Sequence, residues 1–245
     1  QASRKAVEDI LDSGEVVYGI NTGFGALSSV RIEDGQLEEL QSNLVRSHAC
    51  GIGETMDPEL VLMMMTIRAN SLAKGVSGIR PSVVDTLLGM VNSRIAPSIP
   101  RIGSLGASGD LAPLSHMTMG MMGEGECLVE VAGKWVSKDS RTALEEAGLE
   151  PVKLQAKEGL SLINGTSQMC AYLTQTVLNM EILCLTADAS IACSVEAIRG
   201  SHKPFDRRVH DSRPQVGQSI SAARISAFLS QSNIEISHEN CERVQ

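Results

Sequence analysis

The sequence predicts a mainly α-helical protein with one small β-hairpin. Apolar residues recur at helical spacing through much of the chain, and Gly or Pro marks the ends of these segments. The longest such segment, residues 166–199, contains neither Gly nor Pro. Only residues 126–136 show the pattern of strands, with Ala132-Gly133 as the turn between them. These three observations predict the class.

The first helix is expected at residues 1–12, because Ser13-Gly14 follows it as a stop signal. Residues 18–25 contain three glycines and an Asn-Thr pair, so they are expected to form a loop. The second helix is expected at 36–49, where Leu and Val recur at helical spacing. This spacing places His48 on or beside the apolar stripe near the end of that helix.

A third helix is expected at residues 57–74, since Asp57 is a favourable N-cap, Pro58 suits the first turn and Gly75 ends it. Its three consecutive methionines, residues 63–65, are interpreted as adaptable core filler. No His or Cys accompanies them at the spacing of metal ligands.

The later elements are expected in chain order as helix 80–93, extended segment 96–101, buried helix 114–122, hairpin 126–136, and helices 140–147, 166–199 and 219–230. The helix at 166–199 would be about 50 Å long at 1.5 Å per residue. It is apolar around much of its circumference, so we expect it to be buried in a bundle or an oligomer interface.

The composition excludes some classes of partner and predicts a reducing compartment. The net charge is −8, the positive charges are scattered, and aromatic residues make up 2% of the chain, so nucleic acid is not expected as a partner. The six cysteines form no CxxC pair. No signal peptide and no uncharged apolar run of membrane-spanning length are recognised. We therefore expect a cytoplasmic protein without membrane insertion, in a chain cut at both ends.

The tripeptide Ala107-Ser108-Gly109 lies in the glycine-rich run 103–114 and can form an electrophile from its own atoms. Gly109 has no side chain, so its amide nitrogen can approach the carbonyl carbon of Ala107. Ring closure with loss of one water, and loss of a second from Ser108, would leave a methylene group conjugated to an imidazolone. Ordinary side chains supply no carbon electrophile, so this group would act as a built-in cofactor.

Other chemistries find less support in the sequence. No Lys follows the glycine run, so it is not a P-loop, and no GxGxxG unit is present. The five histidines form neither HxxxH nor HExxH, which argues against a zinc hydrolase. A Ser/His/Asp triad that uses Ser108 stays open, because triads assemble from distant positions, although the chain has no GxSxG elbow.

Several motifs together resemble the aromatic amino acid ammonia-lyases, which carry a 4-methylidene-imidazol-5-one (MIO) group. These motifs are GSLGASGDLAPLSHM at 103–117, YGINTGFG at 18–25, LVRSHA at 44–49, KEGL at 157–160, NGT at 164–166 and SHENCERVQ at 237–245. They cover nearly the whole chain in the family's order. The resemblance implies an MIO group made from Ala107-Ser108-Gly109, with no metal.

The resemblance is greatest to members that act on histidine, and it implies elimination of ammonia from L-histidine to give trans-urocanate. Ser47-His48 stands where members acting on phenylalanine or tyrosine have Phe-Leu or His-Leu, so these two residues are expected to recognise the substrate. A phenylalanine or tyrosine lyase or aminomutase is the alternative within this chemistry. The other alternative is a non-catalytic helical assembly fragment in which the tripeptide never cyclises.

The resemblance also implies roles for individual residues. Tyr18 is the candidate base, which requires a positive environment to ionise its phenol. Asn164 would bond the imidazolone oxygen, or cap the long helix, or both. Asp110 would assist cyclisation, or cap the helix that follows it. Gln245 matches a glutamine of the family's active site.

Family members act as homotetramers whose active sites combine residues of several subunits, and they continue past the end of this chain. The resemblance therefore implies a first domain at 1–160 that bears the MIO group, and an incomplete helical bundle at 161–245. It implies an amino acid as the small-molecule substrate. It further implies that this fragment alone is inactive, because residues contributed by the later segment are missing.

Overall fold

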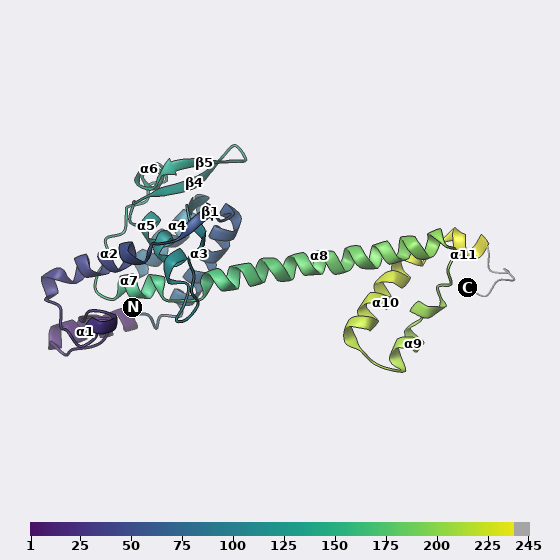
Figure 1. Ribbon diagram of the computed structural model, residues 1–245, viewed down its shortest axis with the longest axis horizontal. Coiled ribbons are helices and arrows are strands. Elements are labelled where there is room, and N and C mark those ends of the chain that lie inside the picture. The colour runs from purple at the N-terminus through teal and green to yellow at the C-terminus, as the bar shows by residue number, and fades with distance from the viewer. Residues whose placement is uncertain (238–245) are drawn as a thin grey trace. The chain divides into compact units, whose positions relative to one another are not determined.

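The computed structural model describes residues 1–237 and divides into two compact units. The first unit comprises residues 1–174 and the second begins at residue 175. The long helix α8, Ser167–Ala197, starts in the first unit and continues in the second (Figure 1). The first unit thus extends beyond residue 160, and the domain boundary expected there stays a prediction.

The mainly α-helical class is confirmed. The helices of the first unit that precede α8 are α1 Ala2–Ser13, α2 Leu37–His48, α3 Pro58–Ala73, α4 Pro81–Asn92, α5 Leu111–Met121, α6 Ser140–Glu146 and α7 Glu158–Ile163, with 3₁₀ turns at Gly25–Leu27 and Asp34–Gln36. Asp57 is the N-cap of α3, as predicted, because its side chain accepts a hydrogen bond from the Glu59 amide.

Two helices of the first unit differ from expectation. Helix α5 begins at Leu111 rather than at 114, because Pro113 falls in its first turn, where a missing N–H costs no intrahelical bond. Helix α7 was not predicted. It contains six residues, too few to show a helical period in the sequence.

The structure contains three short strands that the sequence did not reveal. The predicted hairpin is present as β4, Glu126–Val131, and β5, Lys134–Asp139, with α6 packed against it (Figure 1). Strand β2, Ile95–Pro97, pairs with β4 and extends the hairpin to three strands. Strand β3, Pro100–Ile102, pairs with β1, Ile52–Thr55, in a second sheet. The segment 96–101, which was expected to be extended, therefore contributes to one strand in each of the two sheets.

The core of the first unit is rich in methionine and lies among α2, α3, α4 and α5. Among its fully buried side chains are Met56, Met64, Met65, Met90, Leu114, Met117 and Met121. The interpretation of the α3 methionines as core filler is confirmed for Met64 and Met65, and Met63 packs against this core in part. Burial of these side chains holds α5 and the loop before it in place.

The second unit has a small core. Besides the later part of α8 it contains a 3₁₀ turn at Lys203–Phe205 and the helices α9 Arg207–Asp211, α10 Val216–Leu229 and α11 Asn233–Ser237. Its buried cluster consists of Ala192, Ile225 and Leu229, with Val195 and Phe205 packed against them.

Many large apolar side chains of α8 are exposed in the single chain. They include Leu173, Leu178, Met180, Ile182, Leu183 and Leu185. The segment Glu158–Ala197 is long and apolar enough to cross a membrane, with a mean hydropathy of 1.3 over an 18-residue window. Long core helices of helical bundles share both properties, so length and hydropathy alone do not decide between these environments. The predicted burial of this helix in a bundle or interface stays a prediction.

Candidate active site

The tripeptide Ala107-Ser108-Gly109 forms a bend directly before α5. Ser108 is exposed, whereas Gly109 and Asp110 are buried. The bend thus presents the Ser108 side chain outward while its last residue is anchored in the protein. A hydroxyl that must leave as water is accessible in this arrangement.

The surroundings of Gly109 fit the proposed ring closure. Its φ of +141° disfavours any residue with a side chain, and a Cβ there would lie 2.8 Å from Gly165 N and 3.0 Å from Asn164 Oδ1. Within residues 1–237, neither the Gly109 N–H nor the Ala107 carbonyl takes part in a backbone hydrogen bond. The two atoms that would join are therefore not committed to secondary structure.

Asp110 connects this bend to the start of α8. The residue is fully buried, and its Oδ1 accepts a 2.7 Å hydrogen bond from the Ser104 hydroxyl. Its Oδ2 accepts from the backbone amides of Gln168 and Met169, at 2.9 and 3.0 Å. Of its two expected roles, the cap of the helix that follows it in sequence is wrong, because its side chain makes no capping hydrogen bond to α5, and the role in cyclisation stays a prediction. The side chain caps α8 instead, because the chain folds back and brings that helix N-terminus against the bend.

Asn164 and Gly165 lie against the last residue of the tripeptide. Asn164 follows α7, and its side-chain oxygen faces the Gly109 backbone. The Gly165 carbonyl accepts a 2.7 Å hydrogen bond from the Asp110 amide. The structure thus brings Asn164, Gly109 and Asp110 together. Asp110, rather than Asn164, caps α8.

Arg68, on α3, is a further member of this cluster that the sequence analysis did not identify. Its guanidinium donates hydrogen bonds to the carbonyls of Ser161 and Asn164, the latter at 3.0 Å. The residue is 4% exposed, and burial lowers the pKa of its guanidinium to about 10. A signal was present in the sequence, because Arg68 follows Met64 by four residues and so falls within the buried stripe of its helix.

Ser47 and His48 occupy the last turn of α2. The His48 Nδ1 lies 2.8 Å from the Leu44 carbonyl, so this nitrogen carries the proton and donates. The Ser47 hydroxyl donates to the same carbonyl at 2.9 Å. The His48 ring therefore caps its helix through Nδ1, and its Nε2 is the nitrogen that can accept a hydrogen bond from a ligand.

Tyr18 lies in the loop that precedes the first 3₁₀ turn. It is 57% exposed, and its ring meets Phe24 edge-on with centroids 6.2 Å apart. The loop packs beside α7, since a Cβ on Gly19 would lie 2.7 Å from the Leu160 side chain. Among the described residues, no hydrogen bond or ring contact joins Tyr18 to Ala107–Gly109. Its role as base stays a prediction, and Gln245 lies outside the described residues.

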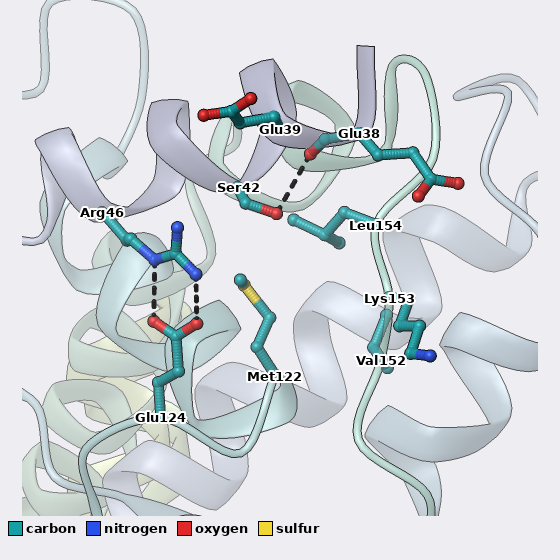
Figure 2. A pocket seen from close by; sticks show the side chains of 9 residues that line it. All are labelled: Glu38, Glu39, Ser42, Arg46, Met122, Glu124, Val152, Lys153 and Leu154. Carbon is teal, nitrogen blue, oxygen red and sulfur yellow. Dashed lines mark hydrogen bonds and ion pairs between the residues drawn. The ribbon is translucent and has the colours of Figure 1, made fainter. Parts of the chain in front are cut away.

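A separate cavity of about 350 Å³ lies between α2 and residues 152–154 (Figure 2). At one side of this cavity, Arg46 of α2 forms a bidentate ion pair with Glu124, with hydrogen bonds of 2.6 and 3.0 Å. This pair raises the pKa of the Arg46 guanidinium through its hydrogen bonds to the carboxylate. The cavity is lined by none of the candidate site residues.

Comparison with protein families and curated sequences gives a consistent result. The family model for aromatic amino acid lyases matches residues 1–245. The histidine ammonia-lyase of Aliivibrio fischeri is 48% identical over 99% of this chain. The alignment covers 47% of that relative, so the chain spans about half the length of the curated relatives it matches.

Solved structures show the same likeness. The crystal structure of histidine ammonia-lyase from Trypanosoma cruzi superposes with a TM-score of 0.86 at 39% identity, over 97% of this chain and 46% of that one. A tyrosine aminomutase from Streptomyces globisporus superposes with a TM-score of 0.87 at 36% identity, over 100% and 48% of the two chains. The backbone is thus common to enzymes of different specificity.

Proposed function

Because this chain belongs to the aromatic amino acid lyase family, we propose that the protein of which it is part eliminates ammonia from L-histidine to give trans-urocanate. The 48% identity to a histidine ammonia-lyase supports histidine as the substrate. The pair Ser47-His48 supports it as well. The chain spans about half of its relatives, so the activity belongs to the whole protein and this fragment alone is expected to be inactive.

One observation carries this proposal: within residues 1–237 the Gly109 N–H and the Ala107 carbonyl make no backbone hydrogen bond, while Asn164 and Gly165 enclose Gly109. Gly109 is thus enclosed, and its amide makes no backbone hydrogen bond with the described residues. This is the arrangement that an internal condensation needs.

The MIO group would form from the chain's own atoms. The Gly109 nitrogen would bond to the Ala107 carbonyl carbon, whose oxygen leaves as water with the amide protons of Gly109 and Ser108, and a double bond forms between that carbon and the Ser108 nitrogen. Ser108 would then lose its hydroxyl and its α-proton as a second water. The group supplies a carbon electrophile, which lets ammonia depart from an amino acid.

The remaining residues would bind the substrate and move its protons. Asn164 would hold the ring through its carboxamide, and Asp110 would keep the bend against α8. Nε2 of His48 would accept a hydrogen bond from the substrate imidazole, with Ser47 beside it. The Tyr18 hydroxyl oxygen would remove the proton from the substrate β-carbon, and Gln245 is assigned to the same site by family resemblance.

A substrate panel on the full-length protein tests the proposal. We expect turnover of L-histidine, followed by urocanate absorbance, and little turnover of phenylalanine or tyrosine. Ser108→Ala should lower the rate by at least about three orders of magnitude, because no methylene can form. Turnover of phenylalanine but not histidine would favour the alternative specificity, and full activity of Ser108→Ala would overturn the chemistry.

We also propose that the full-length protein is a cytoplasmic homotetramer with shared active sites. The exposed apolar side chains of α8 support an assembly, because single soluble chains rarely leave so large an apolar surface uncovered. Five free cysteines among the described residues, Cys50, Cys127, Cys170, Cys184 and Cys193, suit a reducing compartment.

A further inference from the structure

Arg68 is a buried cation whose charge no carboxylate neutralises within the described residues. It is 4% exposed, and its Nε has no hydrogen-bond partner there. The acceptors of its guanidinium are the carbonyls of Ser161 and Asn164. An unpaired buried charge is costly, so a protein that needed only packing at this position would be more stable with an apolar residue.

The Arg68 guanidinium lies directly behind the segment that faces the tripeptide. A Cβ on Gly165 would collide with Nη1 of Arg68. On the other side, Gly165 N and O each lie 2.8 Å from the position of a Cβ on Gly109. Gly165 is therefore held between the guanidinium and the last residue of the tripeptide, and neither contact leaves room for a side chain.

The hydrogen bond from Arg68 also acts on the peptide group that faces Gly109. The Asn164 carbonyl and the Gly165 N–H belong to one peptide unit. Arg68 bonds its oxygen at 3.0 Å, and its nitrogen faces Gly109. A charged donor on the carbonyl polarises the unit and strengthens its N–H as a donor.

We propose that Arg68 is a positioning residue for ring closure: it clamps the Asn164–Gly165 peptide against Gly109 so that the Gly109 nitrogen stays aimed at the Ala107 carbonyl carbon. This inference rests on the proposed function. Arg68 takes no part in bond making, and no atom is transferred to or from it. Its charge keeps the facing peptide polarised while the ring forms.

Arg4 provides a matched control. It is a buried arginine of the same unit, 7% exposed, and donates to the carbonyls of Gly78 and Ala156. Unlike Arg68, it has carboxylate neighbours, with Glu8 at 3.0 Å and Glu158 at 3.9 Å. It makes no side-chain hydrogen bond to Asn164, Gly165 or Gly109 among the described residues. Arg4→Met therefore removes a buried guanidinium without touching the tripeptide.

The test is the intact mass of the full-length protein as a function of time after synthesis, in wild type, Arg68→Lys, Arg68→Met and Arg4→Met. Only the soluble fraction with wild-type circular dichroism is measured. We expect the wild type and Arg4→Met to lose two waters per chain at the same rate. Arg68→Lys should lose them at least about tenfold more slowly, since one ammonium cannot hold both carbonyls in the guanidinium geometry, and Arg68→Met should be slower still.

The outcomes separate this inference from the proposed function. If the wild type keeps its full mass, the proposed function fails and this inference with it. If the wild type and both Arg68 variants lose two waters at equal rates, the clamp is refuted while the proposed function stands. If Arg4→Met is slowed as much as Arg68→Lys, the effect is general destabilisation and the clamp is likewise refuted. Arg68→Lys keeps the test decisive where Arg68→Met does not fold.

Discussion

At the scale of single residues, Asp110 shows how one buried carboxylate can position a reactive segment. Its two oxygens accept hydrogen bonds from the Ser104 hydroxyl and from two amides at the start of α8. Its own amide donates to Gly165. The carboxylate also lies where the partial positive charge of a long helix favours an anion. One side chain thus joins the bend, the segment after α7 and the helix α8.

This arrangement predicts the effect of two substitutions at Asp110 in the full-length protein. Asp110→Ala removes the acceptor of the Gln168 and Met169 amides, of which Gln168 belongs to a buried residue, so we expect a loss of about 2 to 4 kcal/mol in the free energy of unfolding. Asp110→Asn keeps an acceptor oxygen, so its loss in the free energy of unfolding should be less than half that of Asp110→Ala. Urea unfolding measures both, and an Asp110→Ala protein as stable as the wild type would contradict this account.

At the scale of elements, α5 is linked to the loop before β1 through His116. The backbone amide of Gly51 donates a 3.1 Å hydrogen bond to the His116 Nε2. Nε2 must therefore be unprotonated in the folded state. Burial lowers the pKa of His116 below its ordinary value of 6.5. The interaction holds the chain that leaves α2, after Ser47 and His48, against the helix that follows the tripeptide.

A pH dependence of stability follows from the lowered pKa of His116. Below about pH 6.5 the unfolded chain binds a proton at this ring more readily than the folded protein does, so stability falls as pH decreases. Above that pH the ring is neutral in both the folded and the unfolded states, so it does not lower the free energy of unfolding. We expect the wild-type thermal midpoint to fall more between pH 7.5 and 5.5 than that of His116→Gln, since Gln accepts the Gly51 hydrogen bond without titrating. Equal pH profiles would show that His116 does not contribute.

At the scale of the whole molecule, the two units differ in how much apolar surface they bury. The first has an extensive core built on α3, α4 and α5, whereas the buried cluster of the second centres on Ala192, Ile225 and Leu229. A cluster this small supplies little stabilisation for the elements around it. The second unit is therefore expected to gain much of its stability from further chain or from other subunits that cover α8.

The exposed face of α8 predicts a substitution that weakens assembly. Ile182 is 65% exposed in the single chain, so Ile182→Glu should leave the fold of one subunit unaffected. In the proposed tetramer it would bury a charge, and we expect the dissociation constant to rise at least about tenfold. Val76→Glu, at a loop position that is 79% exposed, is the control. Sedimentation that shows the same assembly for wild type and Ile182→Glu would contradict a packed α8.

Much of the fold could be predicted because its signals are local. Asp57 and Pro58 begin α3, Gly14 ends α1 in a left-handed conformation, and the absence of Gly and Pro permits α8. The short strands β1, β2 and β3 were missed because three or four residues carry no measurable period. Their pairing partners lie 30 to 50 residues away, as in Ile95 with Val129 and Ile52 with Ile102.

The same distinction holds for the candidate site. The residues of the tripeptide, with Asp110 and Asn164, were found from the sequence because their chemistry and motifs are local. The alternative role of Asp110 as the cap of α5 was wrong, since nothing in the sequence shows that α8, rather than α5, presents free amides to it.

The sequence alone determined the helical class, the positions of most helices and the tripeptide able to make an electrophile, because propensity, caps and covalent chemistry act between near neighbours. Only the tertiary structure decided that Asp110 caps a helix almost 60 residues away. It alone also placed the Arg68 guanidinium behind Gly165, because burial depends on which segments pack together. Such contacts between distant segments leave no period or spacing in the chain to be read.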